Sequence, residues 1–166
     1  GVSGTPLVRR RMLDPIPVIH DHVARAAETG PWPAALDAVL SAGMADAAVQ
    51  EIAQWPGYAP TPLHVLDALA RTLELAAVSY KDEGQRFRLG SFKALGGAYA
   101  VLRLAAERVG TDDLASVRAG RYRQALGDMT VATATDGNHG RSVAWGAQMA
   151  GCTCRIYIHA EVSPGR

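Results

Sequence analysis

Lys93 is the first of the residues in this 166-residue sequence whose type and placement could support covalent chemistry. Lys93 lies two residues after Ser91, a typical capping residue, so we place Lys93 in the first turn of a helix. The helix dipole disfavours an ammonium there, and burial would favour the neutral amine that forms a Schiff base. Gly96 and Gly97, one turn later, would let a flat ligand approach. The alternative is a surface lysine with its stem along the helix.

The second candidate is the turn Asp136-Gly137-Asn138-His139-Gly140. Its glycines permit close backbone approach, and N–H groups at a helix start bind carboxylate or phosphate. Asn138 offers a donor and an acceptor to a ring substituent, and Asp136 could be a general base if a cleft held it beside a cofactor. The alternatives are that Asp136 or Asn138 only caps the helix, and that His139 only packs against it.

A β-α-β pattern must position this turn. Residues 129–135 predict a strand, residues 141–150 a helix that ends at Gly151, and residues 154–159 a second strand. Short apolar strands around a helix imply a parallel sheet with a right-handed crossover. Ligands of such sheets bind at the carboxyl ends of the strands, where the turn lies. The sequence therefore predicts an α/β fold with a site at this edge.

A long helix should carry Lys93. It starts near Ser91, runs to about Val109 and has two apolar stripes, so we expect it to be buried. One stripe comprises Phe92, Leu95, Tyr99, Leu102 and Ala106, and the other comprises Ala94, Ala98, Val101 and Ala105. Residues 110–128, with low hydrophobicity, predict a surface connection with one short helix.

Upstream, Thr61 as N-cap and Pro62 at the first position predict a helix with Leu66, Leu69, Ala70 and Leu73 facing inward. A strand over 75–80 and a polar loop over 81–88 follow. Earlier still, helices are predicted over 21–29, from Pro33 with Leu36, Val39 and Leu40 on one side, and over 44–55. No motif in the first 55 residues suggests chemistry, so this stretch is interpreted as a packing arm.

The composition excludes several classes of function. With 17 basic and 16 acidic side chains, the net charge is +1, which gives no electrostatic reason to expect nucleic acid or an anionic membrane as a partner. No apolar run approaches the ~20 residues that span a bilayer. Cys152 and Cys154 are interpreted as reduced thiols of a cytoplasmic protein, and no histidines stand at metal-ligand spacing.

Together and in this order, the two segments resemble the fold-type II pyridoxal-phosphate enzymes, which include the serine/threonine dehydratases and tryptophan synthase β. That group places its Schiff-base lysine in an S-x-K helix start and follows it with a G-N-H turn. Here the first segment reads Gly90-Ser91-Phe92-Lys93-Ala94-Leu95-Gly96-Gly97, and the second reads Ala134-Thr135-Asp136-Gly137-Asn138-His139-Gly140-Arg141-Ser142-Val143-Ala144.

A finer resemblance, over roughly residues 55–166, is to the diaminopropionate ammonia-lyase family within that group. It rests on Tyr58-Ala59-Pro60-Thr61-Pro62-Leu63, Lys81-Asp82-Glu83, Arg86-Phe87 and Asp136, where the dehydratases usually have a small residue. One departure is Arg88, where the family pattern Arg-Phe-Gly-Leu leads us to expect glycine.

The resemblance implies parallel sheets with flanking helices in two domains, with pyridoxal 5'-phosphate in the cleft between them. Residues 1–55 would be an N-terminal helical arm, and residues 56–127 the start of the large cofactor-binding domain with Lys93. Residues 128–166 would be the first β-α-β part of a truncated small domain. The family also leads us to expect a cytoplasmic homodimer acting on a small amino acid.

The roles of the site residues come from the same resemblance. Lys93 would hold the cofactor aldehyde and take the α-proton of L-diaminopropionate, and Asp136, on the opposite face, would take that of the D-isomer. Asn138 would bond the phenolic oxygen of the cofactor. Thr135 and the turn, with Asp136, Gly137 and His139, would hold the substrate carboxylate. The products would be pyruvate and ammonia.

The family's glycine-rich phosphate loop does not occur in these 166 residues, which contain no run of three or four glycines. We therefore expect an incomplete portion of a longer enzyme, inactive alone, that holds the nucleophile and one wall of the site. Two alternatives remain. A dehydratase-type lyase handles one enantiomer and needs no second base at Asp136, and a non-catalytic fragment of the same fold would bind no cofactor.

Overall fold

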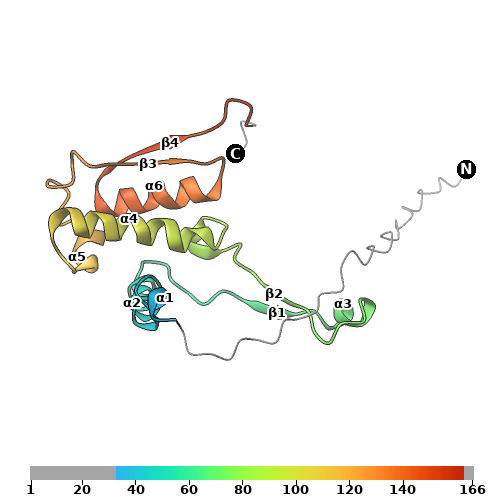
Figure 1. The fold of residues 1–166 in the computed structure, drawn as a ribbon. Coiled ribbons are helices and arrows are strands. Elements are labelled where there is room, and N and C mark those ends of the chain that lie inside the picture. The colour runs from blue at the N-terminus through green and yellow to red at the C-terminus, as the bar shows by residue number, and fades with distance from the viewer. Residues whose placement is uncertain (1–32, 163–166) are drawn as a thin grey trace, which may run out of the picture.

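The computed structural model describes residues 33–162, so the helix predicted over 21–29 lies outside the described residues (Figure 1). In chain order the elements are α1 (Ala34–Asp37), α2 (Ala42–Ala53), β1 (Leu63–Val65), α3 (Asp67–Thr72), β2 (Ser79–Lys81), the 3-10 turn η1 (Arg86–Arg88), α4 (Lys93–Val109), α5 (Leu114–Arg118), β3 (Thr130–Ala134), α6 (Asn138–Ala150) and β4 (Thr153–Tyr157). Within this range no helix is both long and apolar enough to cross a membrane.

The predicted β-α-β unit is confirmed. Strands β3 and β4 pair in parallel, from Thr130 opposite Thr153 to Ala134 opposite Tyr157. Helix α6 connects them and ends at Gly151, whose φ of 83° lies in the left-handed region that favours glycine. The inward side of the sheet packs on α6, because Val131 clusters with Val143 and Ala147.

Helix α4 lies beside α6 and runs in the same direction (Figure 1). Two glycines allow the close contact, because a Cβ at Gly97 would stand 2.6 Å from the Ser142 hydroxyl and one at Gly146 would stand 2.8 Å from the Ala98 Cα. The fully buried Ser142 hydroxyl accepts a hydrogen bond from the Ala98 N–H (2.9 Å) and donates one to the Ala94 carbonyl (3.0 Å). A regular helix pairs those two backbone groups with each other, so α6 engages the backbone of α4 directly.

The main core lies where α2, α4, α5 and α6 meet. It comprises Trp55, Ala98, Leu102, Ala105, Ala106, Leu114, Val117, Leu126 and Ala150. Residues 110–128 contribute three of these, so the expectation of a purely surface connection is wrong, although its one short helix is present as α5. Although residues 110–128 contain few apolar side chains, Leu114, Val117 and Leu126 are all buried in the main core. Trp55 is only 2% exposed, which makes the end of α2 part of this core.

The predicted helix that begins at Thr61 is wrong. Residues 63–65 instead form β1, which pairs antiparallel with β2, and the helix begins only at Asp67. The Thr61 hydroxyl, expected as a cap, is bonded to Glu83 and Arg86. Leu69 and Leu73, expected to face inward, are 43% and 45% exposed, and only Ala70 of that stripe is buried. The predicted strand over 75–80 starts later, at Ser79, and extends to Lys81.

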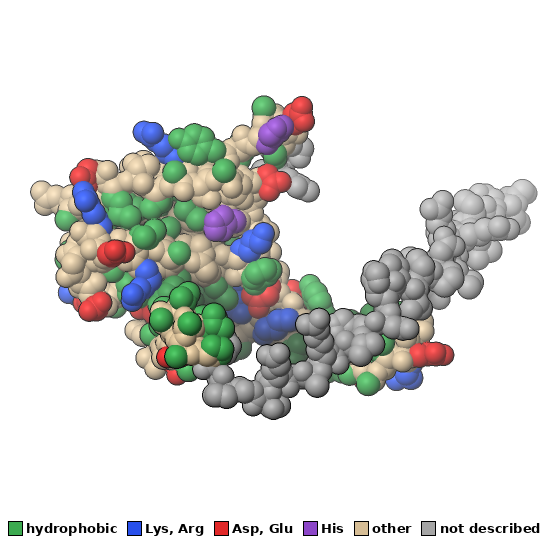
Figure 2. Space-filling model, in the orientation of Figure 1, with side chains coloured by type: hydrophobic (Ala, Val, Ile, Leu, Met, Phe, Trp, Pro, Cys, Tyr) green, Lys and Arg blue, Asp and Glu red, His purple; other side chains and the backbone are tan. Residues whose placement is uncertain are grey.

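The N-terminal helices differ from expectation in length. Helix α2 begins at Ala42, two residues before Met44, because Ser41 caps it by accepting a hydrogen bond from the Met44 N–H. Helix α1 lasts only to Asp37, and apolar side chains of α1, of α2 and of the segment between them gather on an exposed surface (Figure 2). This surface comprises Leu36, Val39, Leu40, Met44 and Val49.

A partly buried ion-pair network joins the segment before β1 to the segment after β2. The Arg86 guanidinium donates to both oxygens of Glu83 (2.7 and 2.9 Å), to the Ala59 carbonyl (2.9 Å) and to the Thr61 hydroxyl (3.0 Å). The hydrogen bonds from Arg86 and then Thr61 lower the pKa of Glu83 from 4.5 to about 2, and those to Glu83 raise the pKa of Arg86. The network fixes the start of the loop that leads to Lys93.

Substituting Gly146 by alanine tests the close packing of α4 on α6. The new methyl group would meet the Ala98 backbone, so we expect Gly146→Ala to lower the free energy of unfolding by about 1–3 kcal/mol. Gly96→Ala is the matched control, because a Cβ there meets nothing within 4 Å and alanine favours helix by roughly 0.5–1 kcal/mol. Urea unfolding of both variants measures the difference, and equal effects would contradict this packing.

The Glu83 network predicts a pH dependence of stability. The pKa of Glu83 is lower in the folded chain, about 2 against 4.5, so its stabilisation is complete above pH 4.5 and is lost as the pH falls toward 2. Urea unfolding at several pH values should show this loss in the wild type and a smaller one in Glu83→Gln, which cannot ionise. Parallel pH profiles for the two proteins would show that Glu83 does not carry this effect.

Candidate active site

Lys93 lies in the first turn of α4, as the sequence predicts, although Phe92 and not Ser91 occupies the N-cap position. The buried Ser91 supports this helix start, because its hydroxyl accepts a hydrogen bond from the Lys93 N–H (3.2 Å). The Lys93 side chain is exposed in the part of the chain that the structure describes. The expectation that burial would favour its neutral amine is therefore wrong there. Gly96, one turn later, is also exposed and borders open space. A planar ligand could therefore reach the amine along this side of α4.

The loop in front of Lys93 has an unusual backbone. Phe87 and Arg88, two consecutive residues other than glycine, have φ angles of 48° and 59° in the left-handed region. Arg88 is the residue that stands where the family resemblance leads us to expect glycine. Its positive φ gives the physical reason for that expectation, because only glycine adopts this conformation without a steric cost.

The predicted turn joins the end of β3 to the start of α6. Thr135 continues the pairing with β4, since its N–H donates to the Tyr157 carbonyl (3.0 Å), and its hydroxyl accepts from the Gly137 N–H (3.4 Å). Gly137 occupies the N-cap position, so neither Asp136 nor Asn138 holds it. Gly140 is required here, because a Cβ would lie 2.8 Å from the Thr135 methyl group.

A pocket of about 180 Å³ opens at this turn. It is lined by Thr135, Asp136, Gly137, Gly140, Arg141, Ala144, Ile156 and Ile158. Three of the predicted substrate-binding residues, Thr135, Asp136 and Gly137, thus meet at one cavity. Lys93, Asn138 and His139 do not line it. Asn138 is the exposed first residue of α6, and His139 is exposed as well, so packing against the helix is not its role in the described residues.

The packing of α4 on α6 places the two motif segments at the same end of adjacent helices. Ser142 contacts Ala94, the residue after Lys93, and lies one helical turn beyond Asn138. The sequence carries no local signal for this role of Ser142, because a serine inside a helix usually bonds to its own backbone or to water. Lys93 thus begins one of two packed helices, and residues 135–138, which we call the 135–138 turn, lead into the other.

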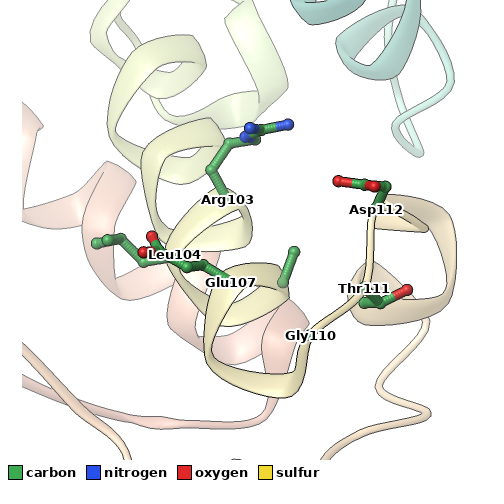
Figure 3. A pocket seen from close by; sticks show the side chains of 7 residues that line it. Arg103, Leu104, Glu107, Gly110, Thr111 and Asp112 are labelled. Atoms are coloured by element: carbon green, nitrogen blue, oxygen red, sulfur yellow. The ribbon is translucent and has the colours of Figure 1, made fainter.

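A second cavity, of about 310 Å³, lies at the far end of α4 and contains no predicted site residue. It is lined by Arg103, Leu104, Ala106, Glu107, Gly110, Thr111 and Asp112. Arg103 and Asp112 point toward one another across it (Figure 3), without forming an ion pair. Within the described residues, no cluster of histidine, cysteine, aspartate and glutamate could hold a metal ion.

Known proteins resemble this chain in both sequence and structure. Diaminopropionate ammonia-lyase of Escherichia coli K12 is 47% identical over 103 residues, which are 61% of this chain and 26% of that protein. The enzyme of Salmonella typhimurium is 41% identical over 107 residues, 62% of this chain and 26% of its own. The chain therefore spans about a quarter of the length of these curated relatives.

The structural comparison gives the same result. The crystal structure of the holo diaminopropionate ammonia lyase from Escherichia coli superposes with a TM-score of 0.66 at 42% identity, covering 75% of this chain and 32% of that one. The structure of that enzyme in complex with D-serine gives the same values. These neighbours confirm the α/β, fold-type II expectation. The sequence profile described as "Pyridoxal-phosphate dependent enzyme" matches residues 54–166, and the chain belongs to that family.

Proposed function

We propose that this chain is part of a longer enzyme that eliminates ammonia from 2,3-diaminopropionate, in both its D and L forms, and yields pyruvate and ammonia. The observation that carries the proposal is that α4 and α6 pack side by side and that each begins in a motif segment, α4 at Lys93 and α6 at the 135–138 turn. The identity of 41–47% to diaminopropionate ammonia-lyases supports the choice of substrate. A cytoplasmic homodimer that contacts neither nucleic acid nor membrane is part of the same proposal.

The residues at this end fit one side of pyridoxal phosphate. Lys93 offers an amine for its aldehyde, and the open space beside Gly96 offers room for its ring. Asn138 offers an amide to the phenolic oxygen. When bound, the cofactor supplies an aldehyde that links to an amine and a ring that delocalises negative charge. The phosphate group would need an anchor outside these 166 residues, which contain no glycine run.

The chain's own residues then divide the proton transfers. Lys93, as a free amine on the face of the ring from which it would hold the cofactor, would take the α-proton of the L-isomer. Asp136 takes that of the D-isomer from the opposite face, because the α-protons of two enantiomers point in opposite directions. Thr135 and the turn at Asp136, Gly137 and His139 hold the substrate carboxylate near a helix start, which favours an anion. Loss of the β-amino group as ammonia would complete the elimination, and hydrolysis of the resulting aminoacrylate by water would give pyruvate and a second ammonia.

A dehydratase-type lyase is the second candidate, and Asp136 argues against it. A dehydratase that uses one enantiomer has no need of a second base, whereas Asp136 lines the pocket at the turn together with Thr135. The relative from Escherichia coli has been crystallised with D-serine, a D-amino acid. A base on the second face of the cofactor is consistent with such a ligand.

Borohydride reduction tests the cofactor lysine. Reducing the full-length protein with bound pyridoxal phosphate should fix the cofactor on the peptide that contains Lys93. Lys81 is the internal control, because it is the other lysine of this chain and donates to the Thr61 carbonyl. We expect Lys93→Ala to abolish elimination with little loss of fold, since Lys93 is exposed. Peptide mass analysis that finds the label on Lys81 would contradict the assignment.

Replacing Asp136 tests the second base. Asp136→Asn keeps the size of the side chain but removes the base, so we expect activity on D-diaminopropionate to fall by about 10²–10⁴-fold, with the L-isomer far less affected. Asp128→Asn is the matched control, because Asp128 pairs with Arg108 on the exposed surface. Steady-state kinetics with each enantiomer give the ratio of the activity loss on the D-isomer to that on the L-isomer. An equal loss on both isomers would make Asp136 a residue that orients the carboxylate, and the dehydratase-like function would gain support.

A further inference from the structure

Three aromatic rings from distant parts of the chain meet beside the loop that leads to Lys93. The Phe87 ring lies 4.8 Å from the Trp145 ring and 5.7 Å from the Trp55 ring, measured between centroids. Trp55 and Trp145 meet edge to face at 5.3 Å. Trp55 follows α2, Phe87 lies in the loop and Trp145 lies on α6. We call these three residues the aromatic clamp.

The clamp is anchored on the side away from the loop. The Trp55 indole N–H donates to a carboxylate oxygen of the buried Glu51 (2.9 Å), and the Arg118 guanidinium donates to the same oxygen (2.8 Å). These bonds satisfy the polar edge of Trp55 and tie α2 to α5. The clamp is therefore fixed by an interaction that involves neither Lys93 nor the 135–138 turn.

The loop that the clamp holds is strained at two successive residues. Phe87 and Arg88 both have left-handed backbones, which side chains with a Cβ disfavour. Such conformations persist where surrounding contacts impose them, and they gather at functional sites. Arg88 is exposed, so Phe87 is the residue of this pair that packs into the protein. On the other side of Phe87, the bonds of Arg86 to Glu83 and Ala59 fix the chain.

We propose that Phe87 and Trp145 are positioning residues for Lys93. Their contact joins the loop before Lys93 to α6, the helix that begins at Asn138, two residues after Asp136. The Phe87–Trp145 contact fixes the chain before Lys93, and the hydrogen bond from the Ser142 hydroxyl to the Ala94 carbonyl fixes the chain after it. The chain on both sides of Lys93 is therefore held against the same helix. The inference rests on the proposed function, because it assumes that Lys93 and the turn act on one ligand.

A core that only stabilises the fold would behave differently from a positioning contact. Loss of packing alone lowers stability and leaves the turnover of the folded enzyme unchanged. Loss of positioning lowers kcat in protein that remains folded, because a displacement of about 1 Å can cost about 10²-fold in rate. It should also change the absorbance spectrum of the bound cofactor, which depends on the surroundings of its link to Lys93.

The experiment compares Phe87→Leu with Leu126→Ala in the full-length protein loaded with pyridoxal phosphate. Leu126 is fully buried in the same core but lies outside the loop, so its variant is the control for stability alone. We expect Phe87→Leu to lower kcat by roughly 10–100-fold with a small change in KM. We also expect it to shift the absorbance midpoint, the pH at which the absorbance change of the bound cofactor is half complete. Leu126→Ala should lower Tm and leave both kcat and that midpoint unchanged.

A strain-relieving second substitution separates the two explanations further. Arg88→Gly removes the steric cost of the left-handed backbone, so adding it to Phe87→Leu should recover part of the lost kcat. Trp145→Phe, which keeps an aromatic ring, should retain more activity than Trp145→Leu. If Phe87→Leu does not fold, these two Trp145 variants test the contact instead. Wild-type kcat and absorbance in folded Phe87→Leu or Trp145→Leu, or an equal loss of kcat in Leu126→Ala, would overturn the proposal.

The absorbance and labelling measurements distinguish this inference from the proposed function. A wild-type protein that binds the cofactor at Lys93 but does not eliminate ammonia from diaminopropionate would refute the proposed substrate only. The shift in absorbance midpoint of Phe87→Leu, read without any substrate, would still support the positioning role. If the wild type is active on diaminopropionate but the Phe87 and Trp145 variants show neither a shift in absorbance midpoint nor a loss of kcat, the proposed function stands. The positioning role of Phe87 and Trp145 is then refuted.

Discussion

The contact between α4 and α6 is the constraint on which the rest of this structure depends. Gly97 and Gly146 leave no room for a Cβ, and the fully buried Ser142 hydroxyl bonds to the Ala94 carbonyl and the Ala98 N–H. A fully buried hydrogen bond fixes the register more firmly than apolar packing does, because a shift would leave buried polar groups unpaired. Both helices begin in a motif segment, so this register also fixes the start of α4, where Lys93 lies, relative to the start of α6.

The parts of the fold that the sequence predicts correctly are those with local signals. The β-α-β unit follows from apolar periodicity and from the glycine that ends α6, and the start of α4 follows from Ser91. The helix expected at Thr61 fails because a distant interaction overrides a local preference. The Thr61 hydroxyl is bonded to Glu83 and Arg86, which lie more than 20 residues further along the chain.

The site shows the same division. The spacing of Ser91 and Lys93 and the Gly137-Asn138-His139 turn are local patterns, and they indicate the family that the sequence profile confirms. The aromatic clamp has no such signal, because Trp55, Phe87 and Trp145 are far apart in the sequence and only tertiary packing brings their rings together. Arg88 stood out in the sequence as a departure from the expected glycine, but its significance needs the φ angle of 59°.

Stability and chemistry are assigned to different residues of this chain. The residues that hold the fold, among them Trp55, Leu102 and Leu126, are almost fully buried, whereas Lys93 and Asp136 are exposed. Exposed side chains contribute little to stability, so substitutions at the site should change the reaction far more than the fold. Phe87 is the exception, because it packs against the core while its backbone carries strain next to Lys93. A residue that serves both purposes links the stability of the core to the geometry of the amine.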